Sequence, residues 1–380
     1  MLYLFTCYMQ QIQKQLRFLI VTLVPQKQER EVTVKDLEET YSLVQTLGNS
    51  IVVDMLQQRA DEPDNRTFIG MGKVQEVAQR VKDDKIDVVV INNIVKSGQL
   101  FNIKKKLQKT SPGIEIWDRI DLILAIFDSH AHTAEAKLQI ELAKMRHMGP
   151  RIYGMGMVLS RQGGGIGGRG IGETNTELMK RHWRDAIKEV QEKLKKLSGE
   201  REKQIQRRRD LGLQTVSIVG YTNAGKTSLF NRLSRKHKLA ENALFATLDS
   251  AVGKMYLPDL GKEILLSDTI GFIRNLPTDL IDAFTSTLLE SVHADILLHV
   301  IDVSDSDMQN KIAVVENILK KIGVNTEKKI YVFTKIDAIV ETLHATSLQE
   351  QYASFSPQFI SVKTGEGIEA LVKEIEKMLA

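Results

Sequence analysis

Short apolar runs alternate with amphipathic segments over the first third of the chain. Between Ile51 and Trp117 the apolar runs have the length of β-strands and read IVVDML, DVVVIN and GIEIW. The segments between them include KVQEVAQRVKDDK and GQLFNIKKKLQK, which have a helical pattern. Such an alternation is typical of parallel pairing, so the pattern predicts a small α/β domain over residues 1–130. The opening MLYLFTCYM is interpreted as a first strand or a frayed start of the chain.

A helical period replaces this rhythm further along the chain. Over Thr133–Met148 the apolar residues fall on one face of a helix, and residues 173–209 form a second, strongly charged helical stretch. Between them, residues 163–172 read GGGIGGRGIG, a glycine density that excludes regular helix or strand. The pattern predicts an antiparallel helical hairpin over residues 131–212 with a Gly-rich tip. The tip is either a flexible linker or a functional element, and its single charge, Arg169, with the basic helix that follows, favours the second.

Strand and helix alternate again from Leu213 to Ala380. Five strand candidates are QTVSIVG, KEILLSD, ADILLHVID, KKIYVFTK and QFISVK, and mostly amphipathic segments separate them. Five or six strands in this arrangement predict a doubly wound, mostly parallel sheet over residues 213–380. The predicted fold class is therefore α/β, with the helical hairpin between two α/β domains.

The composition is that of an ordinary globular protein. Of 380 residues, 42% are hydrophobic and 26% are charged, which fits two or three packed domains. The single cysteine, Cys7, excludes an internal disulfide and fits a reducing cytoplasm. No apolar run reaches the roughly 18 residues that span a bilayer, so we expect no integral membrane segment.

Positive charge is concentrated on the second helix of the predicted hairpin. The formal net charge is only +4, but between Lys180 and Arg209 there are 12 basic and 5 acidic residues, a balance of 12 − 5 = +7. Charge of this density attracts the phosphate backbone of nucleic acids. A solvated helix face is the alternative interpretation.

A phosphate-binding loop opens the third domain. Residues 220–227 read GYTNAGKT and match the pattern GxxxxGK[ST], with an apolar strand before them and an amphipathic helix after them. Glycine allows backbone N–H groups to close around phosphates, Lys226 supplies a positive charge, and the Thr227 hydroxyl can bind Mg²⁺. The positive end of the following helix adds to this attraction. We therefore expect a nucleotide and Mg²⁺ at this loop.

Two further motifs predict that the nucleotide is GTP or GDP. DTIG, residues 268–271, closes a strand, so that Asp268 can hold magnesium and Gly271 can offer its N–H group to the terminal phosphate. TKID, residues 334–337, follows the apolar strand IYVF. The carboxylate of Asp337 can accept hydrogen bonds from the ring N–H and the exocyclic amine of guanine, whereas adenine presents the opposite pattern. SVK, residues 361–363, could support the base through its backbone.

A segment that responds to the third phosphate is expected between these motifs. Thr247 in LFATLDS is the candidate to reach magnesium only when GTP is bound; Thr222 and Ser250 are weaker rivals, because one lies in the phosphate loop and the other enters a strand. The predicted metal ligands are Thr227, Thr247 and Asp268, and the predicted catalytic set is Lys226, Thr247, Gly271 and Phe272. The predicted nucleotide site comprises Gly220, Tyr221, Thr222, Asn223, Ala224, Gly225, Lys226, Thr227, Ser228, Phe245, Ala246, Thr247, Leu248, Asp249, Asp268, Thr269, Ile270, Gly271, Thr334, Lys335, Ile336, Asp337, Ser361, Val362 and Lys363.

With these motifs the chain closely resembles one family, the HflX GTPases, which are ribosome-associated and related to translation factors. The resemblance rests on GYTNAGKTSLFNRL, FATLD and DTIGF, and upstream on FIGMGKVQE, DRIDLILAIF, AEAKLQIELAKM with GPRI, and GGIGGRGIGE. It covers the chain from about Thr46 to the end. It implies an N-terminal α/β domain, a helical hairpin with the Gly-rich loop at its tip, and a P-loop GTPase domain.

The resemblance also implies partners and a task. The family binds the large ribosomal subunit and its rRNA, with the tip reaching toward the peptidyl-transferase region, and splits or blocks stalled ribosomes under stress. We accordingly expect a cytoplasmic monomer, and the sequence leaves open whether a fraction of the protein contacts a membrane. Because the chain ends about where the GTPase domain should, we expect the extra C-terminal domain of some relatives to be absent.

Two residues depart from the common G-protein pattern. Thr334 stands where asparagine is usual, which removes a side-chain amide from the base site. Phe272 stands where Ras-like enzymes carry the glutamine that orients the attacking water, and phenylalanine has no hydrogen-bonding group. The resemblance implies that this apolar residue is a family trait. We hypothesise that the isolated protein hydrolyses GTP slowly and that the large ribosomal subunit accelerates the reaction.

Two other functions compete with this interpretation. The first is an RNA-binding or RNA-remodelling NTPase that acts mainly through the basic N-terminal module, where GMGK, residues 70–73, is an incomplete phosphate loop. The second, a metabolic P-loop kinase, is disfavoured because TKID and SVK have no role there.

Several polar side chains could suggest a metal site or an acid/base pair, but their spacing does not support either. His130, His132, His147 and His182 lack the spacing of metal ligands and are interpreted as surface or packing residues. Asp118, Arg119 and Asp121 are interpreted as residues that start a helix and form ion pairs, not as an acid/base pair.

Overall fold

The computed structural model describes residues 15–162, 171–234, 251–274, 291–324, 328–338 and 357–380, except for the side chains of 150 and 152–176. The chain divides into two compact units, one of Met1–Ser129 with Ile140–Gln191 and one of His130–Gln139 with Glu192–Ala380. Both units combine helices with a largely parallel sheet, so the predicted α/β fold class is confirmed. The division into three domains stays a prediction.

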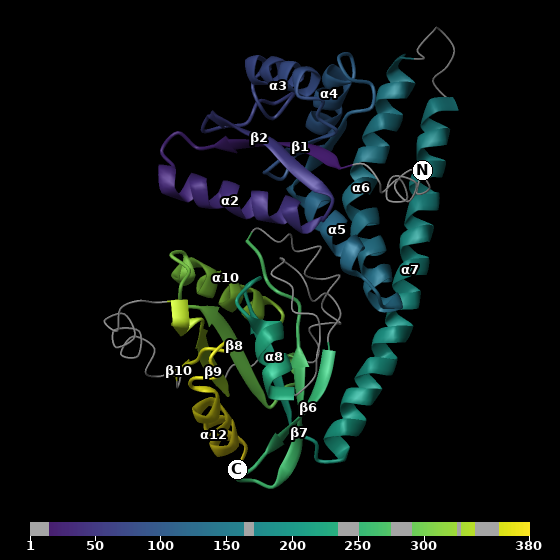
Figure 1. Ribbon diagram of the computed structural model, residues 1–380. Helices are drawn as coiled ribbons and strands as arrows, with labels where there is room; N and C mark the ends of the chain where they lie inside the picture. The colour runs from purple at the N-terminus through teal and green to yellow at the C-terminus, as the bar shows by residue number, and fades with distance from the viewer. Residues whose placement is uncertain (1–14, 163–170, 235–250, 275–290, 325–327, 339–356) are drawn as a thin grey trace. The chain divides into compact units, whose positions relative to one another are not determined.

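The first unit is built on a four-stranded parallel sheet with the strand order β2-β1-β3-β4. Strands β1 and β2 are labelled in Figure 1. Its strands are β1 (Leu16–Val24), β2 (Ser50–Arg59), β3 (Val88–Ile91) and β4 (Glu115–Asp118), and the intervening helices are α2 (Arg30–Thr46), α3 (Met71–Asp83) and α4 (Ser97–Leu107). The inner strands β1 and β3 are buried almost throughout, as a parallel sheet covered on both faces requires.

The strand in the middle of this sheet was not predicted from the sequence. The predicted strand pattern begins at Ile51, whereas the apolar run LRFLIVTLV forms β1 and pairs with both β2 and β3. The alternative of a first strand in MLYLFTCYM lies outside the described residues. The three predicted strands from Ile51 onward and the two predicted helices are confirmed.

Two long helices form the predicted hairpin. They are α6 (Ala134–Gln162) and α7 (Ile171–Asp210), and they follow α5 (Arg119–His130). The indole N–H of Trp183 donates to the carbonyl of Met145 over 2.9 Å. Arg201 pairs with Glu135 at 3.1 Å, so the partners run in opposite directions and the helices are antiparallel (Figure 1).

The helices are longer than the sequence pattern predicts. Helix α6 continues past Met148 and through Pro150, and α7 begins at Ile171, so the irregular Gly-rich stretch does not extend to residue 172 as predicted. Extending an existing helix adds about one backbone hydrogen bond per residue, which can offset unfavourable residues near its ends. The tip at residues 163–170 lies outside the described part. Within that part, no helix is both long and apolar enough to cross a bilayer.

The second unit contains a six-stranded sheet with the order β10-β9-β8-β5-β7-β6. Its strands are β5 (Thr215–Gly220), β6 (Ala251–Leu257), β7 (Lys262–Asp268), β8 (Ile296–Asp302), β9 (Lys329–Thr334) and β10 (Gln358–Phe359). Every pair is parallel except β6 with β7. All five predicted strands form, although β10 is only two residues long. Strand β6 is the sixth, and its alternating burial is that of an edge strand.

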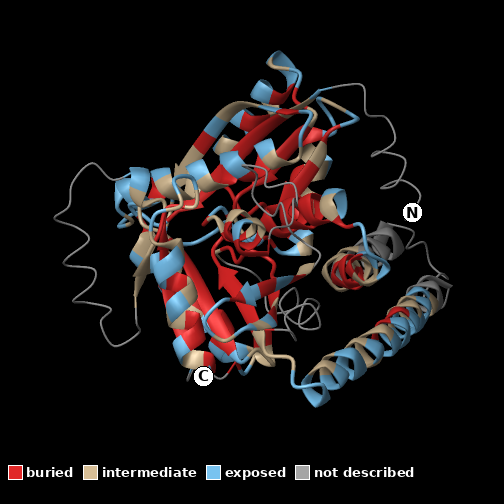
Figure 2. Cartoon of the chain, turned by 60° about the horizontal axis from the view of Figure 1, so that its bottom comes forward, coloured by how far each residue is buried: buried red, intermediate tan, exposed pale blue. Residues whose placement is uncertain are grey.

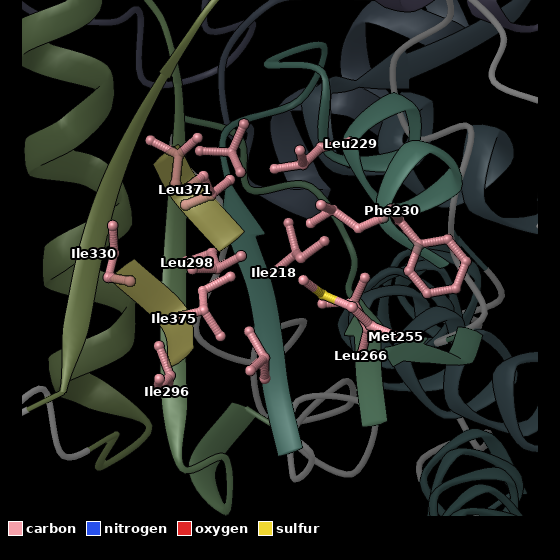
Figure 3. Close-up of a cluster of buried hydrophobic side chains, with 14 of the residues drawn as sticks. Ile218, Leu229, Phe230, Met255, Leu266, Ile296, Leu298, Ile330, Leu371 and Ile375 are labelled. Carbon is pink, nitrogen blue, oxygen red and sulfur yellow. The ribbon is translucent and has the colours of Figure 1, made fainter. Parts of the chain in front are cut away.

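Helices α8 (Lys226–Ser234), α10 (Met308–Lys321) and α12 (Ile368–Leu379) cover this sheet. Figure 3 shows Leu229 and Phe230 of α8 beside Ile218 of β5, with Leu371 and Ile375 of α12 in the same cluster. Figure 2 shows that buried positions gather on the strands and on the inner faces of helices. The order puts β7 and β8 on opposite sides of β5, so the connections diverge at its carboxyl end, where α/β sheets bind ligands.

Candidate nucleotide-binding site

The phosphate loop joins the end of β5 to the start of α8. A Cβ atom at Gly220 would lie 2.3 Å from the carbonyl oxygen of Val300, so only glycine fits there. Asn223 and Gly225 have φ angles of 61° and 91°, in the left-handed region. This backbone makes a concave turn whose N–H groups, with the first turn of α8, can bind an anion.

The side chain of Lys226 lies inside this loop. Its ammonium group is buried and donates a hydrogen bond to the carbonyl of Tyr221 over 2.7 Å. Burial lowers the pKa of Lys226 to about 8, and the nearby charge of Asp268 offsets part of that shift. The group is thus mostly protonated at neutral pH. Because it is shielded from water, its attraction for phosphate is stronger than that of an exposed lysine.

Thr227 and Asp268 come together as the sequence predicts. The Thr227 hydroxyl donates to the carboxylate of Asp268 over 3.0 Å, and Asp268 is fully buried at the end of β7. A hydroxyl and a carboxylate are the oxygen ligands that Mg²⁺ prefers, so this pair fits that ion. Thr247, the third predicted ligand, lies outside the described residues, as do Phe245, Ala246, Leu248 and Asp249.

The segment after Asp268 pairs with the phosphate loop. The amide of Phe272 donates to the carbonyl of Gly220 over 3.1 Å, and the amide of Thr222 donates to the carbonyl of Phe272 over 2.9 Å. A Cβ atom at Gly271 would lie 2.8 Å from the Thr222 side chain and 2.9 Å from the Lys226 ammonium nitrogen. Glycine therefore allows this segment to lie directly against the phosphate loop.

The side chain of Phe272 belongs to the protein interior. It is 2% exposed, and the neighbouring Ile270 and Ile273 are buried too. The hydroxyl of Thr269 donates to the carbonyl of Ile218 over 2.7 Å, which fixes the segment to β5. The apolar residue that replaces the usual glutamine is thus a packing residue whose backbone holds the loop.

A pocket of about 320 Å³ lies beside the phosphate loop, where a base would bind. The hydroxyl of Thr334 donates to the carbonyl of Ala224 over 2.8 Å, and the ammonium group of Lys335 pairs with Asp302 at 2.6 Å. The pocket is lined by Gly225, Ser228, Thr334, Lys335, Asp337, Val362 and Lys363. The motifs at residues 334–337 and 361–363 therefore meet the phosphate loop in one cavity.

Asp337 lines this pocket as an exposed, ionised acceptor. The hydroxyl of Ser361 donates to its carboxylate over 2.6 Å, and this hydrogen bond lowers the pKa of Asp337 below its usual value. The hydroxyl of Ser361 thereby orients the carboxylate of Asp337. From the sequence, residues 361–363 were expected only to support the base through their backbone.

Asp302 is the site residue that the sequence analysis missed. It ends β8 and holds Lys335, which has a left-handed φ of 62°. Its position at a carboxyl strand end, like that of Asp268 on β7, is the signal that could have identified it.

A second polar cluster lies at the β4–α5 junction of the first unit. Asp118, Asp121 and His147 offer ligand atoms close enough together to hold a metal ion. The guanidinium of Arg151 already pairs with Asp118 at 2.9 Å and with Asp121 at 2.7 Å. The interpretation of the two aspartates as helix-start and ion-pair residues is confirmed, with a partner, Arg151, that the sequence did not indicate.

The GMGK segment at the start of α3 does not resemble a phosphate site. The amide of Gly70 donates to the side chain of Gln58 over 2.9 Å, and Lys73 pairs with Glu76 at 2.7 Å. Both groups that a phosphate would need are thus engaged within the protein.

Three family models match successive parts of the chain. Residues 34–128 match the GTP-binding GTPase N-terminal family, residues 130–208 the GTP-binding GTPase middle region, and residues 215–335 the 50S ribosome-binding GTPase family.

Individual proteins match over nearly the whole chain. GTPase HflX of Caldanaerobacter subterraneus subsp. tengcongensis is 40% identical over 363 residues, which are 96% of this chain and 80% of the relative. GTPase HflX of Escherichia coli K12 is 37% identical over 348 residues, which are 91% of this chain and 80% of the relative. The crystal structure of SsGBP in complex with GDP is 26% identical with a TM-score of 0.55, and the match covers 96% of this chain and 98% of that one.

Proposed function

We propose, from the premise that the chain belongs to the HflX family of GTPases, that it is a switch protein that binds and hydrolyses GTP and acts on the large ribosomal subunit. The family resemblance predicted from the sequence is thereby confirmed. The observation that carries the proposal is the convergence of Lys226, Asp268 and Asp337 at the carboxyl ends of one parallel sheet.

Each motif then has one task. Asp337 accepts the two hydrogen bonds that guanine offers, and Lys226 with the loop amides binds the phosphates. Thr227 and Asp268 would hold Mg²⁺, which supplies positive charge against the phosphate oxygens. Gly271 would offer its N–H group to the third phosphate. Residues 245–249, with Thr247, complete the proposed site.

The chemistry of the isolated site is incomplete in one respect. Phe272 is buried and has no hydrogen-bonding group, so it cannot orient the attacking water. We infer that a repositioned segment or a group of the ribosomal partner does so. Hydrolysis is then slow for the protein alone and faster on the large subunit.

Support for a ribosomal partner comes from the family description and from charge. The matched family of residues 215–335 is described as a 50S ribosome-binding GTPase. Helix α7 exposes basic side chains that can follow an RNA backbone, among them Arg181, Arg184, Lys188, Lys195 and Lys196. We propose that this helix and the hairpin contact rRNA, and that a monomer in the cytoplasm splits or blocks stalled ribosomes.

The first experiment measures hydrolysis of GTP and of ATP by the purified protein, with and without large ribosomal subunits, at fixed magnesium and salt. Acceleration that is confined to GTP and requires the subunit supports the proposal. Equal rates for both nucleotides would contradict guanine selectivity, and GTP hydrolysis that does not respond to subunits would contradict the ribosomal partner.

The Lys226→Ala variant separates this function from its rival. It removes the buried ammonium group, so nucleotide-dependent splitting of ribosomes, followed by light scattering, should be lost. An ATP-dependent RNA-remodelling activity that survives in Lys226→Ala would instead favour an N-terminal NTPase. The exposed Lys254→Ala, whose side chain pairs with Glu263 on the sheet edge, is the matched control.

A further inference from the structure

We propose that Tyr221 is a positioning residue for GTP hydrolysis, and that its hydroxyl fixes the segment that carries Gly271. The inference rests on the proposed GTPase function and adds to it. Tyr221 is the second residue of the phosphate loop, but its side chain turns into the protein and is only 5% exposed. A buried phenol usually has a hydrogen-bond partner, and here the partner is the backbone of another motif.

The hydroxyl of Tyr221 accepts a hydrogen bond from the backbone amide of Arg274 over 2.9 Å. Arg274 is three residues beyond Gly271. Together with the two backbone bonds of Phe272, this contact attaches residues 272–274 to three consecutive loop residues, through the carbonyl of Gly220, the hydroxyl of Tyr221 and the amide of Thr222. Of the three attachments, only the one through Tyr221 depends on a side chain.

A second group of contacts, from the start of α10, involves the ring of Tyr221 and the guanidinium of Arg274. The guanidinium of Arg274 forms an ion pair with Asp307, which also accepts a hydrogen bond from Asn310 over 2.8 Å. The ammonium group of Lys311 lies 4.8 Å from the centre of the Tyr221 ring and pairs with Asp305. The start of α10 therefore supports both the ring of Tyr221 and the side chain of Arg274.

This arrangement has a consequence for the third phosphate. The attached segment places Gly271 beside the Lys226 ammonium group, which is where a terminal phosphate would bind. GDP lacks the terminal phosphate that the N–H group of Gly271 would contact. The hydroxyl of Tyr221 should therefore affect GTP binding and hydrolysis but leave GDP binding nearly unchanged.

The test compares Tyr221→Phe with the wild-type protein and with Tyr256→Phe, a control whose ring is 58% exposed on β6. The measurements are single-turnover hydrolysis of GTP, and the dissociation constants of GDP and of a non-hydrolysable GTP analogue. We expect Tyr221→Phe to lower the hydrolysis rate and the affinity for the analogue about three- to tenfold, as for the loss of one ordinary hydrogen bond. The affinity for GDP should change less than about twofold.

Asp307→Asn provides a second, independent variant. It weakens the ion pair that holds Arg274 and leaves the phosphate loop untouched, so it should reduce hydrolysis in the same direction. Because both variants loosen the same segment, the double variant should lose less than the product of the two single losses.

Two results would overturn the inference: a Tyr221→Phe rate within twofold of wild type, or a loss of GDP affinity as large as the loss of rate. The second would show that the loop itself is distorted. A wild-type protein that does not hydrolyse GTP would instead contradict the proposed function, so the two failures are distinguishable.

Discussion

The hydroxyl of Thr334 donates a hydrogen bond to the backbone carbonyl of Ala224 over 2.8 Å, and this contact ties the base-binding motif to the phosphate loop. The same oxygen lies 3.0 Å from the carbonyl of Ile301, and Thr334 is 1% exposed. Thr334, which replaces the usual asparagine, therefore links the base-binding motif to the phosphate loop. The missing asparagine amide changes what the base can contact, but the hydrogen bond between the two loops is kept.

Thr334→Val should weaken nucleotide binding, because valine keeps the shape but leaves the carbonyl of Ala224 without its donor. An unpaired buried acceptor costs about 1–3 kcal/mol, which corresponds to roughly a five- to hundredfold rise in the dissociation constant of GDP if the cost falls on the bound state. Titration with fluorescent GDP measures it. Thr334→Ser keeps the hydroxyl and should bind GDP nearly as well as wild type. If Thr334→Val bound GDP as tightly as wild type, the hydrogen bond to Ala224 would not support nucleotide binding.

Phe272→Gln should not accelerate hydrolysis, although it restores the side chain that other G proteins use. The Phe272 side chain points into the interior, so the new amide would be buried among apolar groups rather than face the phosphates. We expect an unchanged or lower single-turnover rate and a loss of stability of about 2–4 kcal/mol. A variant with a rate increased tenfold would show that residue 272 reaches the water, contrary to this geometry.

Asp337→Asn should change the base preference of the nucleotide site from guanine to xanthine. In the proposed site the Asp337 carboxylate would accept hydrogen bonds from two N–H groups of guanine, whereas an amide offers one acceptor and one donor, which match the ring N–H and the carbonyl of xanthine. We expect the affinity for GDP to fall about a hundredfold and that for xanthosine diphosphate to rise. Competition binding measures both. Ser361→Ala removes only the hydroxyl that orients Asp337 and should have a smaller effect without a change of base preference.

Glu316→Gln should destabilise the second unit in a pH-dependent way. Burial raises the pKa of Glu316, but hydrogen bonds from His299 and Lys329, with their charges, outweigh it and lower the pKa to about 2. A carboxyl whose folded pKa is lowered contributes stability that is fully present above about pH 4.5 and is lost as the pH falls toward 2.

The urea midpoint of Glu316→Gln should therefore lie below that of wild type at pH 7, and the gap should narrow below pH 4.5. Glu369→Gln removes an exposed carboxylate that pairs with Lys373 and should behave like wild type. A gap that is constant between pH 7 and pH 3 would show that packing, not the charge of Glu316, is responsible.

Arg151→Ala should destabilise the first unit by about 3 kcal/mol, since it removes one of the two cations that face the buried carboxylates of Asp118 and Asp121. The other cation is His147, because the two aspartates outweigh the effect of burial and raise its pKa to about 9. The unfolding transition affected should be one that added GDP does not shift, because the proposed nucleotide site lies in the other unit. Lys144→Ala, which removes a more exposed pair with Asp128, should cost less than about 1 kcal/mol. Equal effects of the two variants would contradict a special role for the buried cluster.

The sequence predicts those parts of the structure that depend on local pattern. The phosphate loop, the strand ends that carry Asp268 and Asp337, and the two antiparallel helices all follow from short-range spacing. The contacts of Asp302 with Lys335 and of Tyr221 with Arg274 join residues 33 and 53 positions apart. The hydrophobic periodicity of the sequence does not predict contacts between residues so far apart. Strand β1 was missed although the buried strands β3 and β9 were predicted, because a continuous apolar run has no alternation and periodicity alone does not distinguish a buried strand from a buried helix.

The two sheets also differ in when they can be completed during synthesis. The sheet of the first unit and one of its hydrophobic clusters lie within residues 16–118, so they can form while the rest of the chain is still being translated. The core of the second unit includes Leu371, Ile375 and Leu379 of α12, and β5, its central strand, begins more than 150 residues earlier. A nascent chain from which α12 has not yet emerged therefore lacks the residues that this helix contributes to the core of the second unit. We therefore expect guanine nucleotide to stabilise this unit only after that helix has emerged.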